Sequence, residues 1–165
     1  DEAIMAADAT IPAYWGVRGF QATGPRRFVT VHGWSSIGMA FPAGMGARVG
    51  NPENPVVVIH GDGGFQFNMQ ELGTAIQYDI PLTLLLFNDN AWGVLYQYQD
   101  KLQGGRHFAT KLANPDFMKL ADAYGVRGTR VSNLGALSEE LAASTRSGQF
   151  RIIEIETPNG FDNFE

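Results

Sequence analysis

The stretch VVVIHGDGGFQFNMQELGTAIQYDIPLTLLLFNDN, Val56–Asn90, predicts the fold of this chain. Its two apolar runs, Val56–His60 and Leu82–Phe87, do not alternate between polar and apolar residues, which is typical of strands buried on both faces. Asn68–Tyr78 lies between them and carries apolar residues at helical spacing. A strand–helix–strand unit makes a right-handed crossover, so the two strands are expected to run parallel.

Strands and helices alternate along the rest of the chain in the same way. Further strands are expected at Ala3–Ala6, Phe28–Val31, Thr129–Val131 and Ile152–Ile155. Further helices are expected at Ile37–Val49, Asn114–Tyr124 and Leu137–Thr145. The pattern predicts an α/β fold of three layers: a doubly wound, mainly parallel sheet with helices on both faces.

Two of these helices begin with cap signals, and one long connection stands out. Asn68 and Glu71 have the spacing of a capping box, and Asn114-Pro115 is typical of a cap and first turn. The segment Gln97–Thr110 is predicted as a loop, long enough to serve as a functional lid.

Length and composition limit the class of protein. The chain has 165 residues, enough for a single domain spanning 1–165 with a sizeable core. A net charge of −5 without a Lys/Arg cluster argues against a nucleic-acid partner, and Arg26-Arg27 is expected to be solvated. The lack of cysteine excludes disulfides and thiolate chemistry and fits a cytoplasmic location. No apolar run is long enough to span a membrane.

Acidic residues follow both strands of the opening stretch. Asp62 follows the first strand and Asp89 the second, so their side chains are expected to meet at the carboxyl edge of the sheet, where ligands bind. Gly61, Gly63 and Gly64 allow the backbone to turn tightly and approach a phosphate.

Hard oxygen ligands at this edge suit Mg²⁺. The two carboxylates and the carbonyl of Ala91 would supply three oxygens, and a diphosphate would supply more. Gly-Asp-Gly-Gly alone could be an ordinary turn and Asn-Asp-Asn an ordinary loop. Together, each after an apolar strand, they favour a metal that bridges a diphosphate.

Gly61-Asp62-Gly63 followed at this spacing by Asn88-Asp89 resembles the fingerprint of thiamine diphosphate (ThDP)-dependent enzymes. Ser35–Gly50 and Asn114–Val131 also resemble segments of acetolactate synthase-like members. The resemblance covers nearly the whole chain and points to the C-terminal, diphosphate-binding domain.

The resemblance implies site residues, named by position in this chain. Mg²⁺ would be held by Asp62, Asp89 and the Ala91 carbonyl, although asparagine is commoner at position 89. The cofactor-binding residues would be Ser35, Ser36, Ile37, Gly61, Asp62, Gly63, Gly64, Asp89, Trp92 and Gly93. The substrate pocket would be lined by His32, Trp34, Val94, Leu95 and Tyr98.

The resemblance assigns no catalytic residue to this chain. The activating glutamate of the family belongs to a separate pyrimidine-binding domain, which is absent here, so a partner domain or subunit in a homo- or hetero-oligomer is expected and the chain alone would be inactive. FAD could enter only through a missing domain. Glu71 is expected to cap its helix.

Leu95 stands where pyruvate decarboxylase-like members have glutamate. The favoured activity is an acetolactate synthase-like 2-oxo acid decarboxylase and carboligase. A benzoylformate-type decarboxylase is the alternative, and a non-catalytic ThDP-fold binding or interaction module remains open.

No part in the chemistry is expected for the other two histidines, and packing is expected for Trp92. His60 is expected to be a structural histidine, His107 to be solvated in the loop, and Trp92 to pack in the core or an interface.

Overall fold

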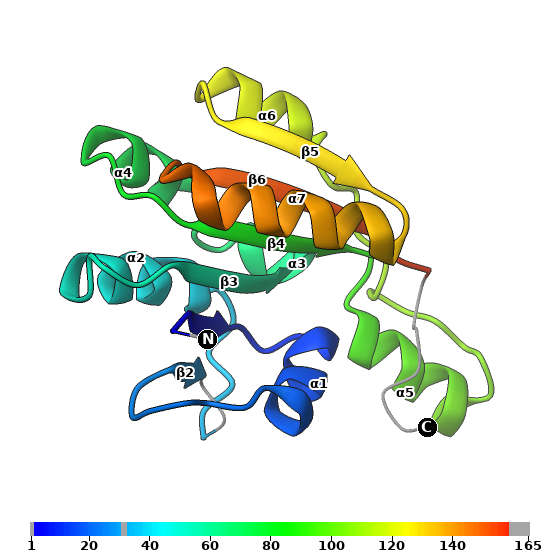
Figure 1. Ribbon diagram of the computed structural model, residues 1–165. Coiled ribbons are helices and arrows are strands. Elements are labelled where there is room, and N and C mark those ends of the chain that lie inside the picture. The colour runs from blue at the N-terminus through cyan, green and yellow to red at the C-terminus, as the bar shows by residue number, and fades with distance from the viewer. Residues whose placement is uncertain (1, 31–32, 159–165) are drawn as a thin grey trace.

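The structure is a computed structural model that describes residues 2–30 and 33–158 (Figure 1). Six strands form one sheet in the order β2-β1-β3-β4-β6-β5, and every pairing between them is parallel. Their bounds are β1 Ile4–Ala7, β2 Phe28–Thr30, β3 Val56–Gly61, β4 Thr83–Asn88, β5 Arg127–Val131 and β6 Arg151–Glu156. Every described strand end lies within two residues of its predicted position, whereas Val31 and His32 lie outside the described residues.

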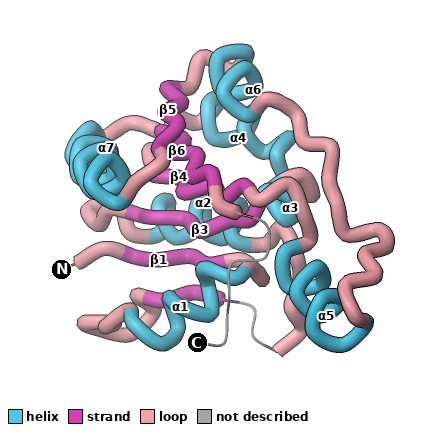
Figure 2. The backbone as a smooth tube through the Cα atoms, turned by 90° about the vertical axis from the view of Figure 1, so that its right-hand side faces the viewer, coloured by secondary structure: helices cyan, strands magenta, loops and turns pink. Residues whose placement is uncertain are grey.

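Helices cover both faces of the sheet, as predicted. Their bounds are α1 Ile11–Gly19, α2 Ala40–Gly50, α3 Asp62–Phe65, α4 Leu72–Gln77, α5 Gly93–Gln103, α6 Phe117–Ala123 and α7 Leu134–Ser147, with a 3-10 turn at Met69–Glu71. Figure 1 shows α7 across one face, and Figure 2 shows α4 and α6 on the other side of β4, β6 and β5. None of the helices in the described ranges is long and apolar enough to cross a membrane.

Two apolar cores explain the three layers. One core joins the sheet to α2, α3, α4 and α6 through buried side chains such as Phe41, Phe65 and Phe117. The other joins the opposite face to α1 and α7 through Ala13 and Leu141, among others. Burial on both faces is the reason that the strands are apolar throughout rather than alternating.

Two helices begin later than predicted, because polar side chains near the site make other bonds. The helix expected from Ile37 begins at Ala40, since the buried Gly38 has φ +93° and donates its N–H to both carboxylate oxygens of Asp8 at 3.0 Å. Asn68 and Glu71 form no capping box. The Asn68 amide donates to the carbonyl of Gly38 at 2.8 Å instead.

Three further predictions need correction. The helix expected at Leu137–Thr145 spans Leu134–Ser147, and Asn133 caps it. Asp116, not Asn114, caps α6, and its carboxylate accepts bonds from the N–H groups of Met118 and Lys119. The segment Gln97–Thr110 is not all loop, because α5 extends to Gln103. The sequence analysis also missed α1, α3 and the first turn of α5.

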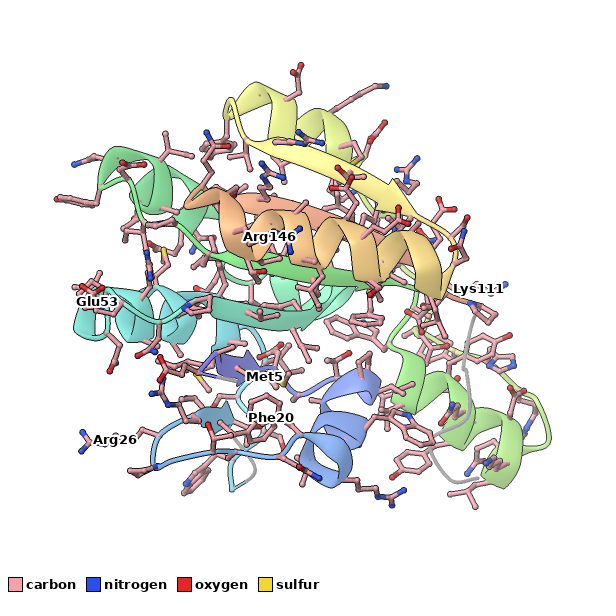
Figure 3. All side chains as sticks on the ribbon, in the orientation of Figure 1. Met5, Phe20, Arg26, Glu53, Lys111 and Arg146 are labelled. Atoms are coloured by element: carbon pink, nitrogen blue, oxygen red, sulfur yellow. The ribbon has the colours of Figure 1, made fainter. Side chains whose placement is uncertain are left out.

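Surface arginines behave as expected. Arg26 is exposed and extends away from the body of the molecule (Figure 3), while Arg27 donates to the carbonyl of Glu2 at 2.6 Å.

Candidate functional site

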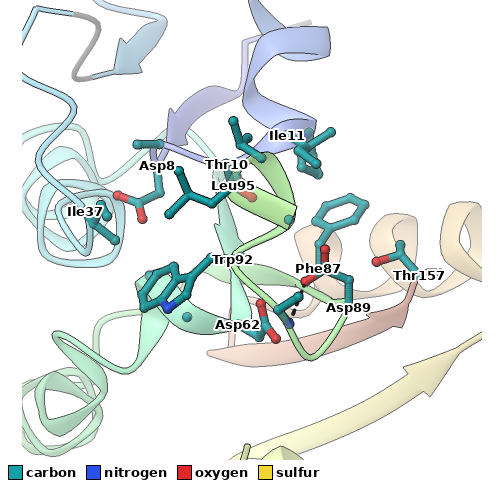
Figure 4. Close-up of a pocket in the computed structure, with 18 of the residues that line it drawn as sticks. Asp8, Thr10, Ile11, Ile37, Asp62, Phe87, Asp89, Trp92, Leu95 and Thr157 are labelled. Atoms are coloured by element: carbon teal, nitrogen blue, oxygen red, sulfur yellow. Dashed lines mark hydrogen bonds between the residues drawn. The ribbon is translucent and has the colours of Figure 1, made fainter. Parts of the chain in front are cut away.

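The ends of three neighbouring strands surround the candidate site. β1 lies between β2 and β3, so the chain leaves β1 and β3 toward opposite faces of the sheet and a crevice opens between their carboxyl ends. A cavity of about 260 Å³ lies there (Figure 4). The residues after β1, β3 and β4 line it, together with the start of α5.

The cavity gathers most of the residues that sequence analysis singled out. Its lining contains Ser35, Ile37, Gly61, Asp62, Gly63, Gly64, Asp89, Ala91, Trp92, Gly93, Val94 and Leu95. Ser36 is outside it, Trp34 is 93% exposed, and Tyr98 lines a separate groove on α5 that it shares with Leu95. His32 lies outside the described residues.

The glycine turn after β3 is held too tightly for side chains. A Cβ on Gly63 would lie 2.6 Å from the ring of Trp92, and one on Gly64 would lie 2.3 Å from Asp8 Oδ2. The turn starts the four-residue helix α3 rather than the longer helix expected behind it. Glycine therefore leaves bare backbone facing the cavity.

Asp62 and Asp89 are both buried and face this cavity from adjacent loops (Figure 4). Asp62 Oδ2 accepts a 2.6 Å bond from Asn114 Nδ2, and Asp89 Oδ1 accepts a 3.1 Å bond from the Ala91 N–H. Burial raises the pKa of Asp62 above 3.8, and the bond from Asn114 offsets that only in part. A buried carboxylate whose charged form is disfavoured is a suitable partner for a cation.

The donor set fits a hard cation that shares its shell with other ligands. No cluster of three or more His, Asp, Glu or Cys side chains forms a metal site within residues 2–30 and 33–158. Two carboxylates and the carbonyl of Ala91 would leave the remaining positions of an octahedron to phosphate and water. These oxygens and the bare glycine backbone fit Mg²⁺ and a diphosphate.

Sequence analysis missed the polar group beneath the glycine turn. Asp8 follows β1, is 1% exposed and lines the cavity. Its Oδ2 lies 3.2 Å from His60 Nδ1. The signal was available, because Asp8 follows an apolar strand just as Asp62 and Asp89 do.

His60 and Asp8 form a unit that supports the turn from below. His60 Nε2 accepts a 3.2 Å bond from the Phe41 N–H, so the imidazole carries its proton on Nδ1, facing Asp8. Burial alone would raise the pKa of Asp8. The facing His60 and the N–H groups of Gly38 and Ala40 outweigh burial and hold that pKa below 3.8.

His107 does not have the surroundings expected for it, whereas Trp92 lies at the cavity, as expected of a cofactor-binding residue. His107 stacks on Tyr96 with ring centroids 3.8 Å apart and lies 2.9 Å from Asp100, so it is not simply solvated. Trp92 lines the cavity and covers Gly63, while its ring contacts Phe67. Glu71 accepts from the Thr74 hydroxyl at 2.6 Å rather than capping its helix.

Fold and site together define a class of protein: an α/β domain whose parallel sheet holds an acidic, glycine-edged ligand cavity at the crevice between β1 and β3. Residues 8–155 match the model of the thiamine pyrophosphate enzyme C-terminal TPP binding domain. The chain belongs to this family and corresponds to that domain.

Individual relatives agree with the family match. The chain is 35% identical over 139 residues to a probable acetolactate synthase large subunit of Methanococcus aeolicus, covering 84% of this chain and 23% of that protein. It is also 35% identical over 153 residues to the corresponding protein of Methanocaldococcus jannaschii, covering 92% of this chain and 26% of that one. The chain thus spans about a quarter of the length of these curated relatives.

A solved structure supports the fold. The thiamine diphosphate-dependent 4-hydroxybenzoylformate decarboxylase of Rhodococcus jostii RHA1 superimposes with a TM-score of 0.84 at 24% sequence identity. The match covers 99% of this chain and 31% of that one.

Proposed function

We propose that this chain binds ThDP together with Mg²⁺ and serves a 2-oxo acid decarboxylase and carboligase of the acetolactate synthase type. One observation carries the proposal. The ends of β3 and β4 bring Asp62, Asp89 and the glycine turn around one cavity, in a chain whose residues 8–155 match the TPP binding domain.

Different groups of this chain would bind the metal and the diphosphate. Asp62, Asp89 and the Ala91 carbonyl would hold Mg²⁺, and the N–H groups of Gly63 and Gly64 would bind the diphosphate. Ile37, which is 40% exposed and lines the cavity beside Gly64, would support the cofactor rings. When bound, ThDP supplies the electron sink for decarboxylation of a 2-oxo acid.

Apolar side chains are exposed near the cavity. Trp34, Leu102 and Phe108 are each more than two-thirds exposed, and Leu95 is 52% exposed. Exposed apolar area of this kind fits a surface that another domain or subunit covers. A pyrimidine-binding domain or subunit would cover it and supply the activating glutamate, so this chain alone would not turn over substrate.

Leu95 and Val94 bear on the substrate. Both line the cavity. An apolar side chain at position 95 suits the acetolactate synthase-like and benzoylformate-type activities, and it does not suit an activity that needs a carboxylate at that position. Product analysis of the full-length protein with pyruvate and with aryl 2-oxo acids separates the two. A carboligation product from pyruvate supports the first activity, and aldehyde from aryl 2-oxo acids supports the second.

Isothermal titration of the full-length protein with ThDP tests the binding step. Affinity should require Mg²⁺ in the unsubstituted protein and in Asp89→Asn, whose amide still offers an oxygen ligand. Asp62→Ala should lose Mg²⁺-dependent binding. Equal affinity in Asp62→Ala and the unsubstituted protein would refute the metal assignment. Binding without turnover of any 2-oxo acid would favour a non-catalytic binding module.

A further inference from the structure

Asn114 joins the two loops that carry the carboxylates. It lies between α5 and α6, remote in sequence from both loops, and is partly buried. Its Nδ2 lies 2.6 Å from Asp62 Oδ2, 2.9 Å from Asn88 Oδ1 and 3.3 Å from Asn90 Oδ1. One amide group thus contacts the loop after β3 and the loop after β4.

The direction of these bonds is fixed by a buried carboxylate at one end. Glu154 is 1% exposed and accepts a 2.7 Å bond from Asn88 Nδ2 and a 2.9 Å bond from Arg130 Nε. An ionised carboxylate can only accept, so the nitrogen of the Asn88 amide must face Glu154 and its oxygen must face Asn114.

The other end fixes the same orientation independently. Asp62, when ionised, is also an acceptor only, so Asn114 must present its nitrogen to Asp62 as well as to Asn88. The remaining oxygen of Asn114 accepts a 2.9 Å bond from Gln66 Nε2. Both protons of the Asn114 amide and its oxygen therefore have partners, which leaves this side chain a single orientation.

We infer that Asn114 is a positioning residue for the cation: by donating to Oδ2 of Asp62, it orients this carboxylate and favours Oδ1 as the oxygen offered to a metal. The inference rests on the proposed function, since it concerns the same cation. An amide donor held at 2.6 Å competes with any approach of the metal to Oδ2. The bond therefore favours monodentate over bidentate coordination by Asp62.

This preference affects the choice of cation. Mg²⁺ requires near-ideal octahedral geometry with short bonds, whereas Ca²⁺ accepts six to eight oxygens and bidentate carboxylates. A carboxylate kept monodentate favours the smaller ion. Release of Oδ2 should therefore weaken Mg²⁺ more than Ca²⁺, and the ratio of the two affinities becomes the diagnostic quantity.

The test uses Asn114→Ala, which removes both donors, and Asn114→Asp, which keeps the shape but has no N–H. Affinities for Mg²⁺ and for Ca²⁺ are measured by calorimetry on the full-length protein with ThDP present. Loss of a bond that orients a ligand should weaken Mg²⁺ roughly ten- to hundredfold. The Mg²⁺-to-Ca²⁺ affinity ratio should fall in both variants, and the extra charge of Asp should largely cancel in that ratio.

Asn133→Ala is the matched control. Asn133 caps α7 by accepting the N–H of Ala136 at 2.9 Å, so its loss lowers stability without touching the cavity. Thermal unfolding without cation reports stability for all three variants. The control should lower the unfolding temperature and leave the affinity ratio unchanged.

Three results would overturn the inference. An unchanged ratio in a folded Asn114 variant means that the amide does not restrict Asp62. A ratio that falls equally in Asn133→Ala means that general stability is the cause. Failure of both Asn114 variants to fold makes Asn114 a structural residue. Failure of the proposed function is distinguishable, because the unsubstituted protein would then bind no ThDP with either cation.

Discussion

Substitution of Gly64 by alanine should be far more harmful than a glycine-to-alanine change normally is. A Cβ at this position would lie 2.3 Å from Asp8 Oδ2, 3.2 Å from Ile37 Cγ2 and 3.3 Å from His60 Nδ1. Neither polar neighbour can easily move, because the Gly38 N–H donates to both oxygens of Asp8 and the Phe41 N–H donates to His60 Nε2.

The expected cost follows from two contributions. Forcing an extra methyl group into a packed site costs about 1–3 kcal/mol. Displacing Asp8 also weakens a bond to a charged group, which contributes about 1.5–3 kcal/mol. The sum, about 2.5–6 kcal/mol, corresponds to a fall in unfolding temperature of roughly 5–24 °C for a domain of this size.

Thermal and urea unfolding of the full-length protein, without cofactor, measures this cost. Gly46→Ala is the matched control, because Gly46 lies on the exposed side of α2 with no atom within 4 Å of an added Cβ. That change should raise stability by about 0.5–1 kcal/mol through helix propensity. A Gly64→Ala protein within about 1 kcal/mol of the unsubstituted one would refute the packing account of the turn.

Three carboxylate-to-amide changes give further tests. Asp8→Asn should lower stability by about 2–4 kcal/mol at neutral pH. The low folded pKa of Asp8 contributes stability above 3.8 that is lost as pH falls through the folded value, so unfolding curves of the two proteins should converge in acid. Asp62→Asn should stabilise the cation-free protein at neutral pH, because burial raises the pKa of Asp62 and disfavours its charged form. The gain should vanish below pH 3.8, where the carboxyl group is protonated in both the folded and the unfolded protein. A variant less stable than the unsubstituted protein at pH 7 would contradict this. Asp89→Asn should keep Mg²⁺-dependent thermal stabilisation by ThDP, and loss of that shift would show that position 89 needs a charge.

The fold was predictable because its signal is local and repeated. Apolar runs without alternation, such as Val56–His60 and Leu82–Phe87, mark buried parallel strands whatever the rest of the chain does. Ligands bind at the carboxyl ends of such strands, which predicted that Asp62 and Asp89 would meet there. Both line one cavity in the structure.

What could not be predicted depends on contacts between distant segments. The side chains of Asn68 and Asn114 resemble helix caps in sequence but bond across the fold, to Gly38 and to Asp62. An N-cap is worth about 1 kcal/mol, and the bond from Asn114 to the buried carboxylate of Asp62 matches or exceeds that value. The loop after β1 is different, because Asp8 follows an apolar strand as Asp62 and Asp89 do, and the same rule predicts its place at the cavity.

One cation between the loops after β3 and β4 is the central feature of the proposed site. A crystal structure of the full-length protein with ThDP and Mn²⁺, in which anomalous scattering locates the metal, tests this directly. We expect one peak within about 2–2.5 Å of an oxygen of Asp62, an oxygen of Asp89 and the Ala91 carbonyl, with the diphosphate completing the shell. A peak that shares no ligand with Asp62, or a diphosphate bound away from Gly63 and Gly64, would contradict it.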